Sequence, residues 1–225
     1  LGHVWTQGMV KHYFLTGDPF LKETAELIGD NLARLVEDGV YAFGIDDPHF
    51  GRVAGWPLLA MADAEALARG IGEFDVARMT MSAPHPYPVE VAEGWIVLTS
   101  ARRRRGVEFT FVVQPEGSEA SGCATVFKRG ADPEWEVGYW IAKPLWGRGY
   151  ASEALGALLA WARTELGAKR AKARHLVENP ASRRVLDKAG FTPTGRTTLD
   201  YCLALGQRAP GVEMTLDLAS AASAA

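Results

Sequence analysis

Cysteine is scarce in this 225-residue sequence, which holds only Cys123 and Cys202. The two thiols lie far apart and lack the spacing of metal ligands, so we expect reduced thiols in a cytoplasmic protein. The five histidines show no metal-ligand spacing either, and no metal is expected. Long apolar runs are missing, which argues against a membrane-spanning helix. Lys11, His12 and Asp18 do not fit a signal peptide.

Strong charge of either sign is also lacking. The net charge of −3 argues against a general nucleic-acid binder, and neither nucleic acid nor a membrane is expected as a partner. The basic run 102–105 precedes Gly106 and is interpreted as a helix end, where cations complement the helix dipole. A nucleic-acid or ribosome contact is the less favoured alternative. The sequence has no Gly-x-Ser-x-Gly elbow and no Gly-Lys-Ser/Thr ending, which excludes the common serine-hydrolase and P-loop classes.

A pair of glycines stands between a strand-like run and an amphipathic helix. In the turn 146–152, Gly147 and Gly149 can adopt backbone conformations closed to other residues, so successive N–H groups can point at one anion. The following helix adds its positive N-terminal end. We therefore predict a pyrophosphate-binding turn, with an ordinary glycine turn as the alternative. The helix is predicted from apolar residues at three-and-four spacing, namely Ala151, Ala154, Leu155, Leu158, Leu159, Ala162 and Leu166.

A strand at 170–177 and a short helix follow. Asn179, Pro180 and Gly190 suit the N-cap, the first helical position and the end of this helix. With these elements, the chain from about residue 62 to residue 218 resembles the GNAT superfamily of acyl-CoA-dependent N-acyltransferases. Within it, the chain resembles the branch that includes the ribosomal-protein N-terminal alanine acetyltransferases. The matching motifs are Trp135–Ile141, Trp146–Ala154, and Asn179–Ser182 continuing into Lys188–Phe191.

The resemblance implies an α/β (α+β) fold with a mixed central sheet and acetyl-CoA as cosubstrate. It implies transfer of an acetyl group to a primary amine, protein N-terminal or small-molecule, by direct attack in a ternary complex. A backbone N–H near Ile141 would polarise the thioester carbonyl. Asn179 would cap its helix and also hold the pantetheine arm. The implied cofactor contacts are Tyr139, Trp140, Ile141, Trp146, Gly147, Arg148, Gly149, Tyr150, Ala151, Ser152 and Asn179.

Two residues are predicted to act in the chemistry. In the strand 134–142 the side chains alternate, so Glu136 shares a face with Gly138. Glu136 matches a glutamate often found in this motif, which implies a base acting directly or through water. A solvent-facing glutamate is the alternative. The tyrosine that much of the superfamily has on the last helix aligns with Leu186 and is therefore absent. Ser182, on the same helical face, is expected to donate a hydrogen bond to the departing thiolate.

The remaining elements are predicted from periodicity and turn residues. Helices are predicted at 63–69 and 88–104, and strands at 107–114, 122–128, 134–142, 194–204 and 211–216. The superfamily has one more strand before residue 63. Residues 52–56 lie at nearly the right distance, but Gly55 and Pro57 suit neither a long strand nor an unbroken helix. A first strand at this place and a missing first strand both stay open.

Residues 1–60 have a different character. Helical periodicity at 4–15 and 19–36 predicts a hairpin, and the segment resembles a fragment of an (α/α) toroid of carbohydrate-processing proteins. Sugar-site residues in such a family would be His3, Trp5, Gln7 and His12. Packing between the two helices is the favoured interpretation, because one hairpin cannot close a pocket.

The predicted organisation is a helical segment at 1–50, a GNAT-like domain at 51–218 and a flexible tail at 219–225. The alternative function is a carbohydrate-related helical module joined to a non-catalytic, CoA-binding GNAT-like domain. The sequence does not identify the amine acceptor, although the proline-rich segment 84–88 is a candidate wall for its site. The oligomeric state also stays open.

Overall fold

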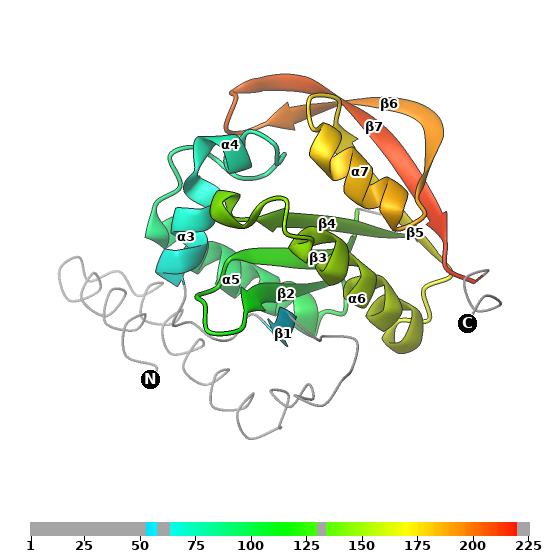
Figure 1. The fold of residues 1–225 in the computed structure, drawn as a ribbon, viewed down its shortest axis with the longest axis horizontal. Helices are drawn as coiled ribbons and strands as arrows, with labels where there is room; N and C mark the ends of the chain where they lie inside the picture. Colours follow the sequence, from blue (N-terminus) through cyan, green and yellow to red (C-terminus); the bar gives the residue numbers. More distant parts are fainter. Residues whose placement is uncertain (1–52, 58–63, 130–133, 220–225) are drawn as a thin grey trace.

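The structure, a computed structural model, describes residues 53–57, 64–129 and 134–219. The predicted helical hairpin in the segment 1–50 lies outside these residues, as do the tail beyond residue 219 and all of the toroid-like segment 1–60 except residues 53–57. The described part of the chain is drawn in colour in Figure 1.

A seven-stranded mixed sheet forms the centre of the fold, in the order β1-β2-β3-β4-β5-β7-β6. Neighbouring strands are antiparallel except β4 and β5, which run parallel. This arrangement confirms the predicted α/β fold with a mixed sheet. The strands are β1 (Val53–Pro57), β2 (Glu108–Pro115), β3 (Gly122–Lys128), β4 (Trp135–Ile141), β5 (Arg170–Leu176), β6 (Thr192–Cys202) and β7 (Gln207–Asp217).

Helices cover both faces of the sheet (Figure 1). The longer ones on opposite faces are α5 and α6, and α4 is a single turn that the sequence did not predict. Within the described ranges, no helix is long and apolar enough to cross a membrane. The helices are α3 (Ala64–Gly72), α4 (Phe74–Ala77), α5 (Val89–Arg104), the 3₁₀ turn η3 (Lys143–Leu145), α6 (Tyr150–Glu165) and α7 (Pro180–Lys188).

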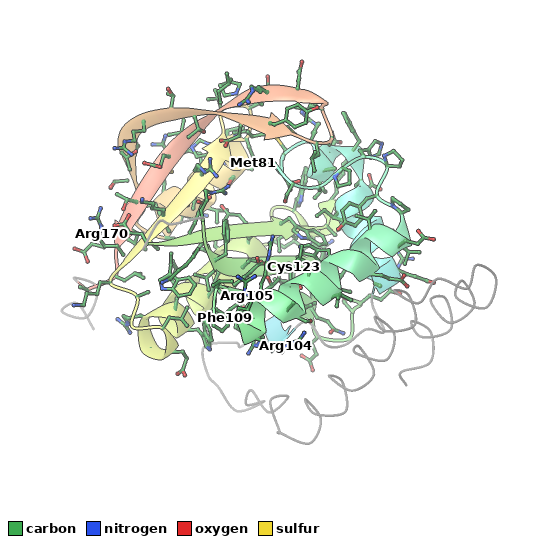
Figure 2. The ribbon with its side chains drawn as sticks, turned by 180° about the vertical axis from the view of Figure 1, so that it is seen from behind. Met81, Arg104, Arg105, Phe109, Cys123 and Arg170 are labelled. Atoms are coloured by element: carbon green, nitrogen blue, oxygen red, sulfur yellow. The ribbon has the colours of Figure 1, made fainter. Side chains whose placement is uncertain are left out.

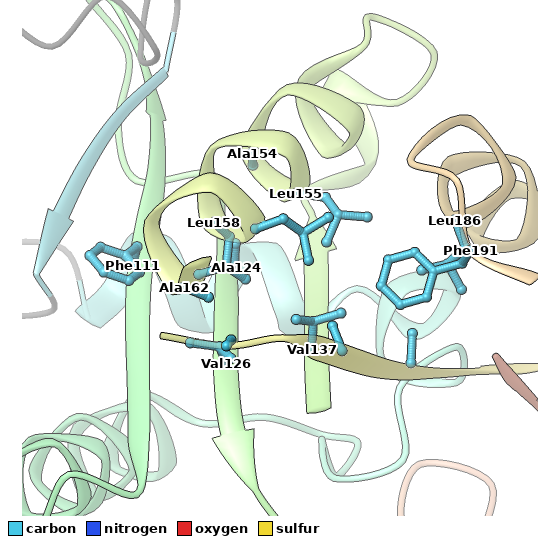
Figure 3. Close-up of a cluster of buried hydrophobic side chains, with 14 of the residues drawn as sticks. Phe111, Ala124, Val126, Val137, Ala154, Leu155, Leu158, Ala162, Leu186 and Phe191 are labelled. Carbon is cyan, nitrogen blue, oxygen red and sulfur yellow. The ribbon is translucent and has the colours of Figure 1, made fainter. Parts of the chain in front are cut away.

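The larger core lies between α6 and the sheet. Leu155 and Leu158 on α6 are almost completely buried and face Val126 and Val137 on the strands, as Figure 3 shows. This contact explains the apolar spacing that predicted the helix. Each such side chain contributes about 1.5–3 kcal/mol through burial. The same core includes Leu186 from α7, so α7 is packed against the sheet beside α6.

A second, smaller core lies on the opposite face, under α3 and α5. Leu67 and Ile96 meet Val112 and Cys123 of the sheet there. Burial raises the pKa of the Cys123 thiol well above its usual range, so this cysteine behaves as a small apolar residue. Cys123 and Cys202 are both free thiols, as the sequence predicted.

The region before α3, where the sequence left a first strand open, does contain a strand. β1 pairs antiparallel with β2, from Val53 opposite Pro115 to Pro57 opposite Phe111. Gly55 and Pro57 are tolerated because β1 has only one neighbour in the described sheet, so no second ladder needs their backbone groups. The possibility of a missing first strand is therefore wrong.

The basic run at the end of α5 behaves as a helix end. Arg102 forms an ion pair with the buried Glu108 at 2.8 Å. Arg103 stacks over Phe109, 5.6 Å from the ring centroid, and burial lowers its pKa. Arg104 is the last helical residue and points into solvent on the face seen in Figure 2. The run thus serves packing and the helix dipole.

Candidate active site

The parallel strands β4 and β5 separate near the middle of the sheet. Among the described residues they pair only from Trp135 opposite Ala171 to Val137 opposite Ala173. Beyond this point β4 continues beside β3, while β5 continues beside β7. The separation leaves a stretch of β4 backbone without a strand on one side, and these groups can bind a ligand.

Backbone donors of β4 face this opening. The N–H of Ala142 donates to Ser121 O at 2.7 Å, on the β3 side. Because the N–H groups of successive strand residues point to alternate sides, those of Tyr139 and Ile141 point toward the side of β5. The carbonyl of Ile141 accepts a hydrogen bond from the Trp146 indole at 2.7 Å. Ile141 N–H therefore has the orientation expected of a donor to a thioester carbonyl.

The glycine turn has the conformation that the sequence predicted. Gly147 has φ +76° and Gly149 has φ +90°, values that other residues adopt only with strain. Gly149 is the N-cap of α6, and no side chain caps the helix. The first N–H groups of α6, from Tyr150 to Ser152, therefore lack partners within the helix. The turn itself is exposed to solvent.

An anion fits this turn, because uncapped N–H groups and the helix dipole meet in one exposed place. An ordinary glycine turn is exposed as well, so the contact with a pyrophosphate stays a prediction. Trp146, 47% exposed, is held at the turn by its indole hydrogen bond. The exposed Arg148 adds a positive charge between the two glycines.

The N-terminus of α7 lies across the opening from β4. Asn179 Oδ1 accepts a hydrogen bond from Ser182 N–H at 2.9 Å, which confirms the predicted N-cap. Pro180 occupies the first helical position, as predicted. The predicted contact of Asn179 with the pantetheine arm stays a prediction.

Tyr139 bridges from β4 to this helix. Its Oη lies 2.9 Å from Ser182 Oγ and donates to Ser182 O at 3.1 Å. Burial raises the pKa of Tyr139 to about 12, an effect that its hydrogen bond with Ser182 partly opposes. Sequence reasoning placed both residues at the site but missed this contact. Only the three-dimensional register of β4 against α7 brings the two hydroxyl groups together.

Glu136 lies on the opposite face of β4. Its Oε2 accepts from Arg129 Nε at 2.7 Å, and its Oε1 accepts from Arg129 Nη2 at 2.8 Å and Arg174 Nε at 3.2 Å. The residue is 8% exposed, so the solvent-facing alternative is wrong. Both carboxylate oxygens are engaged by guanidinium groups, an arrangement that offsets the cost of burying the charge.

Arg174 links Glu136 to a second carboxylate. Its Nη1 donates to Asp200 Oδ1 at 2.5 Å, and the Arg174 side chain is only 10% exposed. Asp200 belongs to β6 and was not considered from the sequence. The predicted strands 170–177 and 194–204 both contain charged residues, which are rarely buried without a partner, but the sequence does not show which of them meet.

The segment after α3 is attached to the rest of the fold near this face. Met81 O accepts from Leu203 N–H at 3.2 Å, so the segment contacts the turn of the β6–β7 hairpin, where Figure 2 labels Met81. Asp75 binds Lys143 at 2.8 Å, and this pair lowers the pKa of the carboxyl. His85, in the proline-rich segment, contacts Gly72 O at 2.9 Å. Whether this segment forms a wall for the acceptor stays a prediction.

Within the described residues, no three histidine, cysteine or acidic side chains gather as a metal site would require. The groups that the structure brings together here are backbone N–H groups, two hydroxyls on one face of the sheet and two carboxylates on the other.

A family model described as "Acetyltransferase (GNAT) domain" matches residues 57–192. Sequence comparison with curated proteins finds no match. Similar solved structures include RimJ of Mycobacterium smegmatis in complex with CoA-disulfide, at 24% identity and a TM-score of 0.63, covering 73% of this chain and 81% of that one.

Two further structures share the fold at lower identity. Spermidine N-acetyltransferase from Vibrio cholerae, in complex with CoA and spermine, has 17% identity and a TM-score of 0.62, covering 75% of this chain and 96% of that one. Ribosomal-protein-S5-alanine acetyltransferase from Vibrio fischeri has 18% identity and a TM-score of 0.62, covering 73% of this chain and 91% of that one.

Proposed function

The chain belongs to the GNAT acetyltransferase family, and on that basis we propose that it transfers an acetyl group from acetyl-CoA to a primary amine. The acceptor is a protein N-terminus or a small molecule. The observation that carries the proposal is a combination of two features. The pairing between β4 and β5 ends after Val137, and the helix that follows β4, α6, begins without a side-chain cap. The first feature provides donors for a thioester, and the second provides donors for a pyrophosphate.

The residues present fit acetyl-CoA. The turn 146–152 offers uncapped N–H groups to the pyrophosphate, with Arg148 beside them. Tyr139, Trp140 and Ile141 border the opening beside β4, and Asn179 lies across it on α7. Bound there, acetyl-CoA supplies an activated acetyl group, and Ile141 N–H is the donor for its carbonyl oxygen.

The transfer proceeds by direct attack of the amine nitrogen on the thioester carbon. The C–N bond forms and the C–S bond breaks, so the nitrogen must lose a proton and the sulfur must gain a hydrogen bond or a proton. Ser182 Oγ faces the sulfur's side of the sheet and donates that hydrogen bond. A serine hydroxyl is too weak an acid for full transfer at neutral pH, so its role is to stabilise the thiolate.

Tyr139 acts through Ser182. Full transfer of its proton to a thiolate would be uphill, because the pKa of Tyr139 is about 12 and that of a free thiol is about 8.5. The phenol instead supports the serine. When Tyr139 O–H donates to Ser182 Oγ, the proton of the serine hydroxyl is free to point at the sulfur.

Glu136 is the base predicted from the sequence, but its contacts make direct removal of a proton from the amine unfavourable. Both of its oxygens already accept guanidinium hydrogen bonds, so direct removal of the amine proton would have to displace one of them. We propose that its main function is to hold Arg174 in place. The face of the sheet that carries Glu136, Arg174 and Asp200 is called the acceptor face below.

The alternative of a CoA-binding domain without turnover rested on a missing first strand, and β1 is present. The experiment that distinguishes an active acetyltransferase from a CoA-binding domain without turnover has two parts. Calorimetry measures acetyl-CoA binding to the full chain, and mass spectrometry then measures acetylation over a panel of peptide α-amines, polyamines and alkylamines. Binding together with at least one acetylated amine supports the proposal, and binding without any acetylated amine contradicts it.

A further inference from the structure

Two carboxylates share one guanidinium on the acceptor face. Arg174 Nε binds Glu136 at 3.2 Å and Arg174 Nη1 binds Asp200 at 2.5 Å. Arg174 follows Ala173, the last β5 residue paired with β4, so this group lies where the two strands separate. It therefore borders the place where the transferred acetyl group would meet the amine.

The two carboxylates differ in how fully they are engaged. Glu136 accepts hydrogen bonds on both oxygens, whereas Asp200 accepts on Oδ1 alone. Asp200 Oδ2 is buried and has no partner in the described part of the chain, and the same holds for Thr198 Oγ1 and Arg174 Nη2. A buried polar atom without a partner costs about 1–3 kcal/mol, so three of them near one another call for a ligand or water.

The unpartnered oxygens of Asp200 and Thr198 lie together. A Cβ at Gly211 on β7 would be 2.5 Å from Thr198 Oγ1 and 3.4 Å from Asp200 Oδ2, so both oxygens lie against the same bare glycine. On the β4 side, a Cβ at Gly138 would meet only the ring of Phe127, at 3.8 Å. The missing side chain at Gly138 leaves room between the acceptor face and the thioester.

We propose that Asp200, assisted by Thr198, binds the ammonium group of the acceptor and takes its proton. This inference rests on the proposed acetyltransferase function. Asp200 Oδ2 accepts a hydrogen bond from the R–NH₃⁺ group and receives one proton, which gives R–NH₂ and a neutral carboxyl. The nitrogen then attacks the thioester, the C–S bond breaks, and the second nitrogen proton leaves as the amide forms. One proton ends on the CoA thiol and one is released to solvent.

The charged groups around Asp200 fit this role. Arg174 of β5 faces it directly, and Arg129 after β3 lies close enough for its own pKa to be raised in part by Asp200, after the larger effect of Glu136. Glu136 faces it from β4 across Arg174. The β7 residue paired with Asp200 is Ala209, which adds no charge. On the same face, Glu213 of β7 lies opposite Arg174 and Lys172 of β5 lies opposite Glu136, so these two residues add one carboxylate and one cation. The three cations and three carboxylates balance, and one oxygen of Asp200 has no partner among the described residues.

Asp200→Asn tests the proposal through the pH profile. With an amine that wild type acetylates, kcat/KM should fall about 100-fold or more near pH 7 in the variant. The loss should shrink as the pH approaches the pKa of the acceptor, because the amine then arrives already neutral. Tyr139, whose pKa is about 12, stays protonated throughout this range. Asp200→Glu should restore part of the activity, and Asp187→Asn, which removes an exposed acid on α7, is the charge control.

Thr198→Val provides a second test that does not depend on the ion pairs. The Thr198 hydroxyl has no partner among the described residues, so a purely structural role predicts unchanged or higher thermal stability and unchanged kinetics. The proposal predicts the same stability with a KM for the amine raised about three- to tenfold. Thr197→Val, at the exposed neighbouring position on the other face of β6, is the matched control.

Binding of the amine can also be measured without turnover. Calorimetric binding of the amine to the enzyme–CoA complex should weaken in Asp200→Asn, while acetyl-CoA affinity stays at the wild-type value. Wild-type pH profiles and amine affinities in folded Asp200→Asn and Thr198→Val overturn the assignment and leave the acetyltransferase function intact. Failure of wild type to acetylate any amine overturns the proposed function itself, and the inference with it.

Discussion

Tyr139 Oη lies 2.9 Å from Ser182 Oγ, so a hydrogen bond joins β4 to α7 across the opening left by the separation of β4 and β5. The phenol has two acceptors within reach, because Ser182 O lies 3.1 Å away. Its single proton can therefore move between the carbonyl and the serine hydroxyl. In the proposed transfer, the second arrangement would free the serine proton for the sulfur while negative charge develops there.

Ser182→Ala should slow turnover without changing acetyl-CoA affinity. The lost hydrogen bond is made to a developing charge, so the expected cost is about 1.5–3 kcal/mol of transition-state stabilisation. Steady-state kinetics and calorimetry measure the two quantities separately. Weaker acetyl-CoA binding with an unchanged kcat would show that Ser182 serves binding alone.

Tyr139→Phe should have a smaller effect, because the serine can still donate to sulfur. We expect a cost of about 0.5–1.5 kcal/mol in kcat/KM. In the double variant with Ser182→Ala, the loss should equal that of Ser182→Ala alone, since the phenol acts through the serine. Additive losses would instead indicate that Tyr139 has a separate role.

Gly149→Val should abolish acetyl-CoA binding. Gly149 has φ +90°, which a β-branched residue adopts only with strain, and its N–H neighbours would turn away from the pyrophosphate. Circular dichroism should stay native-like, because the core beneath α6 is untouched. Gly156→Ala, at an exposed helical position with free space around it, is the control. Unchanged calorimetric affinity in Gly149→Val would reject the phosphate-binding turn.

Glu136→Gln should lower turnover about equally at neutral and high pH. A glutamine at this position leaves Arg174 and Arg129 with a weaker acceptor, and raising the pH does not repair that loss. The measurement is the pH profile of kcat/KM beside that of Asp200→Asn. Recovery at high pH in Glu136→Gln, without recovery in Asp200→Asn, would make Glu136 the group that takes the proton.

Residues 51–225 should fold and bind CoA without the segment before them. The range contains β1, which covers one edge of β2 by five residue pairs. We therefore expect a soluble product with a cooperative melt that CoA shifts upward. Insolubility of this product, with a soluble full chain, would mean that the domain boundary proposed at residue 51 is wrong.

Local sequence patterns predicted most elements of the fold. β3 has the predicted bounds, and α6 begins at the residue after Gly149, because the glycine conformation and the apolar stripe both act within a few residues. β6 begins earlier than predicted, at Thr192. An irregularity near Gly195, with φ +81°, lets the strand resume pairing after an interruption, and alternation alone does not reveal it.

The site was predicted less completely, because its decisive contacts join distant segments. Glu136 and Ser182 were identified from motifs, but Asp200 becomes visible only when β6 is aligned through β7 with β5. Likewise, the pairing of Tyr139 with Ser182 depends on where α7 crosses β4. A single sequence contains no local signal for either relation, since both depend on strand register.

Amine-dependent release of the CoA thiol by the full chain tests the central claim most directly. With acetyl-CoA and the amine panel, wild type should release thiol only when an acceptor amine is present, and Gly149→Val should release none above background. Acetyl-CoA binding by wild type without thiol release for any amine, or equal release by wild type and Gly149→Val, would contradict the account.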